Sequence, residues 1–196
     1  ISNHSSGKQG HAIATALAQA GAEVILVSGP VAIDPPRDVT VVDVVSARDM
    51  EQAVARSLPA DIAVFVAAVA DWRVDCEAAE KIKKDGSGNP PALTMVENPD
   101  ILKGVGMGSQ RPALVIGFAA ETQNLIGNAR KKLAKKGADW IVANDVSPDT
   151  GTFGGNSNTV VLVSKSGEEN WPSASKDEVA ERLVEKIAER FEVVEV

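Results

Sequence analysis

Short apolar runs alternate with amphipathic stretches along most of the chain. The apolar runs are short and rich in β-branched residues, so they predict strands at 22–28, 39–45, 61–68, 113–118 and 139–143, the first two of them buried and parallel. Between the runs, apolar residues recur at helical spacing, which predicts helices over 9–20, 46–58 and 124–136. Strands that alternate with helices favour an α/β fold with a doubly wound, Rossmann-like parallel sheet.

Two stretches depart from this alternation. From Asp71 to Pro91 the periodicity fails, and within it the polar, glycine-bearing, strongly basic stretch 80–91 predicts a mobile loop. In the last third, an apolar run at 158–164 and a turn at 165–167 predict a small antiparallel β-ribbon. We therefore expect one domain over 1–196. It would consist of a nucleotide-binding core over 1–145, a ribbon segment over 146–175 and a closing helix over 176–192.

Capping residues mark where two of the helices begin. Ser46 and Asp49 have the spacing of a capping box before the second helix. Ser175 and Glu178 repeat this spacing before the closing helix.

Composition narrows the class of partner. The chain carries 20 basic and 27 acidic residues, a formal net charge of −7, so it lacks the basic surface that binds nucleic acid. No apolar run approaches the roughly 20 residues that cross a bilayer, so no membrane partner is expected. Cys76 is the only cysteine, which excludes an internal disulfide and favours a reducing cytoplasm. Two histidines, His4 and His11, are too few for a multi-histidine zinc site, and the lack of tyrosine removes the general acid of short-chain dehydrogenases.

Several polar residues stand where α/β proteins bind ligands, beyond the strand ends and at the start of the first helix. Ser5, Ser6 and Gly7 suit an anion, although they match no standard nucleotide motif and also fit a plain capped loop. Asp71 could hold a ribose or Mg²⁺, or simply be a loop carboxylate. The lysines at 81–84 and on the helix at 132 and 136 are of a kind that commonly faces solvent.

Six short sequence clusters, which follow one another in the expected order, resemble those of phosphopantothenoylcysteine synthetases. More narrowly, they resemble the C-terminal synthetase half of bacterial bifunctional coenzyme A biosynthesis proteins. They lie at Ile1–Lys8, Ala67–Asp71, Glu80–Lys84, Asn98–Ile101, Gly117–Thr122 and Ala143–Asp145. Members of this family carry a further strand, and a flavin-dependent decarboxylase half, ahead of the segment that matches Ile1. We therefore expect an exposed sheet edge here and no FMN on this segment.

The resemblance implies a ligase of coenzyme A biosynthesis. It would join 4′-phosphopantothenate to L-cysteine with CTP and Mg²⁺, through an acyl-cytidylate, releasing CMP and pyrophosphate. It would be a cytoplasmic homodimer that uses the later ribbon as an interface, fused to the decarboxylase in the parent chain. From the residues alone, two other classes stay open: an NAD(P)-binding Rossmann oxidoreductase and a nucleotide-binding module without turnover.

The resemblance also assigns roles to single residues. Asn3 would act on the acyl intermediate and bind substrate with Ala68, Lys81 would help to form the intermediate, and Asp71 would hold the metal. The positions expected to contact nucleotide are Ser5, Ser6, Gly7, Ala67, Asp71, Lys81, Asn98, Pro99, Asp100, Ile101, Phe118, Lys132 and Lys136.

Overall fold

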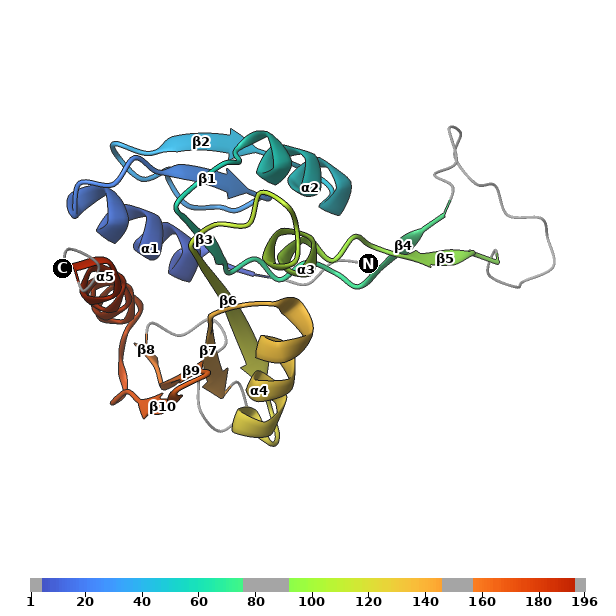
Figure 1. Cartoon of the computed structure of the whole chain (residues 1–196). Coiled ribbons are helices and arrows are strands. Elements are labelled where there is room, and N and C mark those ends of the chain that lie inside the picture. Colours follow the sequence, from blue (N-terminus) through green and yellow to red (C-terminus); the bar gives the residue numbers. More distant parts are fainter. Residues whose placement is uncertain (1–4, 76–91, 146–156, 193–196) are drawn as a thin grey trace.

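A five-stranded mixed sheet forms the centre of the molecule. The computed structural model describes residues 5–75, 92–145 and 157–192 (Figure 1). The strands run in the order β10-β9-β7-β6-β3. Their bounds are β3 Ile62–Phe65, β6 Leu114–Glu121, β7 Trp140–Asp145, β9 Val160–Ser164 and β10 Gly167–Asn170. The β3-β6-β7 part is parallel, as predicted, and β9 and β10 continue it as an antiparallel hairpin.

The hairpin belongs to this sheet and is not a separate ribbon. Val161, Leu162 and Val163 of β9 pair with β7 along its length. The prediction of antiparallel strands in the last third is confirmed, and these strands extend the central sheet. The reason is burial: β9 is apolar at four successive positions, which suits a strand covered on both faces.

Helices cover both faces of the sheet. The alternating side chains of β9 show this, because Val160 and Leu162 enter one buried cluster while Val161 and Val163 enter the other. The first cluster packs against α1 (Lys8–Gln19) and α5 (Lys176–Glu192), which also lie against each other. The second packs against α3 (Ile101–Gly106) and α4 (Leu125–Lys136). The first cluster draws residues from all three of the expected segments, 1–145, 146–175 and 176–192.

A second parallel pair lies beside the main sheet. It consists of β1 (Ile25–Ser28) and β2 (Thr40–Asp43), followed by α2 (Ala47–Arg56). Among the described residues β1 pairs only with β2, and β3 pairs only with β6, so each has an open edge of the kind expected. The prediction that the two strands are buried is wrong: Ser28 is the one buried residue in them, and Ile25 is 46% exposed. Because the pair lies outside the five-stranded sheet, the neighbouring elements cover its side chains only in part.

A two-stranded ribbon projects from the body of the molecule in Figure 1. Its strands are β4 (Trp72–Val74) and β5 (Met95–Glu97), which are antiparallel. Irregular structure was predicted over 71–91, which is wrong for β4, because its partner lies some twenty residues later and local periodicity cannot reveal such pairing. The predicted mobile loop, 80–91, lies outside the described residues. Two further short strands, β8 (Ser157–Asn158) and β11 (Ala174–Ser175), pair with each other.

Both predicted capping boxes are confirmed. Ser46 Oγ accepts a hydrogen bond from Asp49 N, and Asp49 Oδ2 accepts one from Ser46 N at 3.0 Å. Ser175 Oγ accepts from Glu178 N at 3.1 Å, and Glu178 Oε2 accepts from Ser175 N at 2.7 Å. In the described part of the chain, no helix has the length and apolar character needed to cross a membrane.

Candidate functional site

The loop before α1 ends at a left-handed glycine and leads directly into the first turn of that helix. Gly7, the residue before the helix, is left-handed at φ 72°, and a Cβ there would lie 2.6 Å from Val31 Cγ1. No described side chain caps α1, and its first turn holds no acidic residue, whereas α2 and α5 have capping boxes. Ser5 and Ser6 are exposed, and Ser5 Oγ accepts a hydrogen bond from Gly7 N at 3.3 Å. Backbone N–H groups at such an end favour negative charge.

The segment 67–71 lies next to this helix end. A Cβ placed on Gly10 of α1 would be 3.8 Å from Val66, so the helix packs closely on the end of β3. Ala67, Ala68 and Asp71 are all exposed. These predicted ligand contacts are therefore accessible and adjacent to the loop before α1.

Asn98 holds the same segment from its other side. Its backbone N donates to Asp71 O at 2.8 Å, and its Nδ2 donates to Ala70 O at 2.8 Å. Asn98, which the resemblance predicts to contact the nucleotide, thus also fixes the chain that leads into β4. Pro99 is half-buried and Ile101 is buried at 8% exposure, so the Ile101 side chain packs inside.

Two lysines of α4 point back towards this edge of the sheet. Lys132 Nζ donates to Phe118 O at 2.7 Å, and Lys136 Nζ forms an ion pair with Asp100 Oδ2. The Lys136 side chain is only 20% exposed. Neither lysine is the solvated surface group that its position on an amphipathic helix suggested.

The charges at this edge are mutually dependent. Burial and the neighbouring Lys136 lower the pKa of Lys132, while the carboxylates of Glu121, Asp100 and Asp71 act to raise it. Burial acts to raise the pKa of Asp100, but the hydrogen bonds from Lys136 and from the Lys103 backbone outweigh it and hold that pKa below its usual range. The predicted residues Asp71, Asp100, Phe118, Lys132 and Lys136 thus share one electrostatic environment.

Glu121 belongs to this environment and was not predicted as a site residue. Its Oε2 accepts a hydrogen bond from Asn128 Nδ2 at 2.8 Å. The only sequence signal was its place in the Gly117–Thr122 cluster, directly after an apolar strand. The two predicted catalytic residues, Asn3 and Lys81, lie outside the described residues.

The sequence matches the family described as the DNA/pantothenate metabolism flavoprotein C-terminal domain over residues 1–191. The chain belongs to this family. Among its relatives, the coenzyme A biosynthesis bifunctional protein CoaBC of Escherichia coli is 44% identical to it over 194 residues. The matched region covers 98% of this chain and 48% of that protein. With CoaBC of Bacillus subtilis it shares 41% identity over 191 residues, 96% of this chain and 46% of the relative. The chain thus spans about half the length of the curated relatives it matches.

Solved structures agree with this family membership. The crystal structure of the C-terminal domain of CoaBC superimposes with a TM-score of 0.79 at 38% identity, covering 98% of this chain and 86% of that one. A Cab2 variant in complex with phosphopantothenate-cysteine has a TM-score of 0.72 at 13% identity, covering 97% and 79%, and this likeness concerns the fold alone. The resemblance to the C-terminal half of CoaBC, inferred from six short clusters, is confirmed.

Proposed function

We propose that this chain is a phosphopantothenate–cysteine ligase that uses CTP. It would join 4′-phosphopantothenate to L-cysteine through an acyl-cytidylate and release CMP and pyrophosphate. The observation that carries the proposal is the edge of the sheet where the α1 loop, the segment 67–71 and two half-buried lysines meet. It occurs in a chain 44% identical to CoaBC over almost its whole length, and the related fold of Cab2 accommodates phosphopantothenate-cysteine.

The first half-reaction activates a carboxylate. The carboxylate of phosphopantothenate attacks the α-phosphorus of CTP, and pyrophosphate leaves. Negative charge builds on the phosphate oxygens, so cationic groups at fixed positions stabilise the transition state. Lys132 and Lys136 would bind the phosphates from α4, and Lys81, by family resemblance, would act at the α-phosphate.

The second half-reaction forms the amide. The amine of cysteine attacks the acyl carbon of the acyl-cytidylate, and CMP leaves with the bonding electrons. The amide of Asn3 would donate a hydrogen bond to the oxyanion of the tetrahedral intermediate. Removing one such donor typically costs about 3–4 kcal/mol of transition-state stabilisation.

Asp71 would hold Mg²⁺ in this scheme. Mg²⁺ is usually bound by one or two carboxylates together with substrate phosphates and water, and Asp71 is an exposed carboxylate at the end of the segment 67–71. Among the described residues, no group of three histidine, cysteine or acidic side chains could hold a metal by itself. Asp71 therefore fits a site that the triphosphate completes, where the cation would neutralise charge on the phosphate oxygens.

The choice of base, the oligomer and the compartment are further parts of the proposal. Backbone groups near Ala67 and Phe118 would read the amino group and O2 of cytosine, so UTP should be used about 5- to 150-fold less efficiently. The enzyme would be a cytoplasmic homodimer, fused to the flavin-dependent decarboxylase. β10 ends the sheet in the described part of the chain, and such an edge is where a second copy could pair.

One assay separates the proposal from its alternatives. The protein is mixed with CTP, Mg²⁺, 4′-phosphopantothenate and cysteine, and pyrophosphate is measured. Release supports the ligase, CTP binding without release indicates a module without turnover, and affinity for NAD(P) alone indicates an oxidoreductase.

Two variants then assign the half-reactions. Asn3→Asp should still release pyrophosphate but form no cysteine adduct, because a carboxylate repels the oxyanion. Lys81→Gln should block pyrophosphate release itself. Near-parental product formation by Asn3→Asp, or normal accumulation of acyl-cytidylate by Lys81→Gln, removes that residue from its role.

A further inference from the structure

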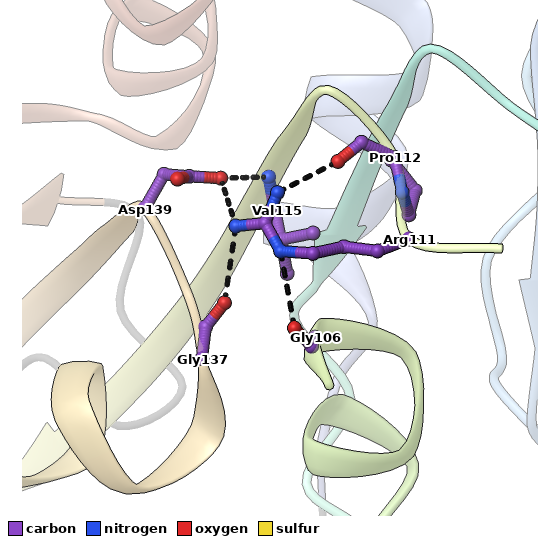
Figure 2. Close-up of polar contacts among 6 residues, drawn as sticks. All are labelled: Gly106, Arg111, Pro112, Val115, Gly137 and Asp139. Atoms are coloured by element: carbon purple, nitrogen blue, oxygen red, sulfur yellow. Dashed lines mark hydrogen bonds and ion pairs between the residues drawn. The ribbon is translucent and has the colours of Figure 1, made fainter. Parts of the chain in front are cut away.

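The guanidinium of Arg111 joins the C-terminal ends of α3 and α4. Its Nε donates to Gly106 O at 3.0 Å, and its Nη2 donates to Gly137 O at 3.1 Å (Figure 2). The remaining contacts are Nη1 to Pro112 O at 2.8 Å and Nη2 to Asp139 Oδ2 at 2.7 Å. All three nitrogens are therefore engaged by the fold.

Asp139 ties this cluster to the central sheet. The Oδ2 atom that accepts from Arg111 also accepts a hydrogen bond from Val115 N, at 2.8 Å, near the start of β6. The guanidinium thus fixes two helices and one strand with respect to each other.

Two glycines let the helices come close enough for one side chain to reach both. A Cβ on Gly106 would overlap the carbonyl oxygen of Lys136, and a Cβ on Gly137 would lie 2.7 Å from Gly106 O. Gly137 is left-handed at φ 65°, the conformation in which helices commonly end at a glycine. This close approach places the carbonyls of Gly106 and Gly137 within reach of the same guanidinium.

The same two helices also meet at the candidate site. Asp100 caps α3, because its Oδ1 accepts from Lys103 N at 3.2 Å, and its Oδ2 pairs with Lys136, the residue before Gly137. Since α3 has only six residues, the position of Asp100 depends on where Gly106 is held at its other end. A shift of α3 against α4 would separate Asp100 from Lys136.

We infer that Arg111 is a positioning residue for the candidate site: by holding Gly106 and Gly137 with one guanidinium, it sets the place at which Asp100 holds Lys136. The inference rests on the proposed function, in which Lys136 contacts the nucleotide. Arginine is required because lysine has a single nitrogen, which cannot bind both carbonyls and Asp139 with the same planar geometry.

The test combines Arg111→Lys with Lys136→Met. In the purified protein, Arg111→Lys should raise the KM for CTP on the order of tenfold, the size expected for one misplaced charged contact, and leave kcat nearly unchanged. In a Lys136→Met background, the same substitution should change KM less than about twofold, because the group that it positions is gone. Asp139→Asn keeps an acceptor but removes the charge that orients Arg111, so it should raise KM in the same direction.

A matched control separates positioning from loss of stability. Ile187→Ala lies in the C-terminal half of α5, at a residue only 4% exposed, and should lower Tm at least as much as Arg111→Lys with no change in KM. If Lys136→Met leaves KM for CTP unchanged, the nucleotide site itself is wrongly placed. If Lys136→Met raises KM while Arg111→Lys and Asp139→Asn do not, or if the Arg111 effect persists undiminished in the Lys136→Met background, Arg111 has no positioning role.

Discussion

Gly106→Ala adds one methyl group where α3 and α4 touch. Its Cβ would overlap the backbone oxygen of Lys136 and lie 3.1 Å from that of Gly137. Gly106 is buried, and the atoms in the way are backbone, which cannot rotate aside as a side chain could. The two helices must therefore separate to admit the methyl.

The cost follows from two opposing effects. Overpacking of a buried site typically costs about 1–3 kcal/mol, and a backbone obstacle favours the upper part of this range. Alanine in place of glycine in a helix returns up to about 1 kcal/mol. The net loss should be about 1–2 kcal/mol, which lowers Tm by roughly 2–8 °C in a chain of this size.

Gly104→Ala is the matched control in the same helix. No atom lies within 4 Å of the Cβ that it would add, so it should retain only the gain in helix propensity and unfold at the same or a higher temperature than the parent. Thermal unfolding of the three proteins, followed by circular dichroism, measures the difference. Equal melting of Gly106→Ala and Gly104→Ala would refute the close approach of α3 and α4.

Two further variants test the electrostatics of the site. Lys132→Met should raise Tm, because burial and Lys136 lower the pKa of Lys132 and the methionine carries no buried charge. The same variant should weaken CTP binding about tenfold. Thermal unfolding and calorimetric titration measure the two effects, and a lowered Tm contradicts the reasoning. Asp100→Asn should make the free energy of unfolding depend less on pH in acid. The pKa of Asp100 is lowered below its ordinary value of 3.8 in the folded protein. The stability that Asp100 contributes is therefore present above that value and is lost as pH falls through the folded-state pKa. Urea midpoints between about pH 5 and pH 2 measure this, and identical pH profiles for Asp100→Asn and the parent would exclude it.

Local sequence patterns predicted the elements that are stabilised locally. The capping boxes at Ser46 and Ser175 depend on residues three positions apart, and both are present. The apolar runs at 113–118 and 158–164 predict strands, and β6 and β9 form there. In each case the physical cause lies within a few residues of the element itself.

The elements that sequence missed depend on distant partners. β4 exists because it pairs with β5, and the half-exposed state of β1 reflects which strands adjoin it, neither of which periodicity encodes. Lys132 and Lys136 have the spacing of solvated helix residues, yet their amine groups reach Phe118 O and Asp100. Arg111 had no distinguishing signal, because its role depends on carbonyl groups that any residue would supply.

The two lysines of the candidate site are already paired with or close to three carboxylates, and this shapes how the site would bind a nucleotide. Asp100 already pairs with Lys136, and the carboxylates of Glu121, Asp100 and Asp71 favour the charged form of Lys132. Under the proposed function, a triphosphate would therefore compete with Asp100 for Lys136 and meet repulsion from three carboxylates. A cation held between Asp71 and the phosphates would remove much of this repulsion, because it replaces an unfavourable pair of like charges by two favourable ones. Under the proposed function, the affinity for CTP should thus depend on the Mg²⁺ concentration more steeply than it would if the two lysines alone neutralised the phosphates.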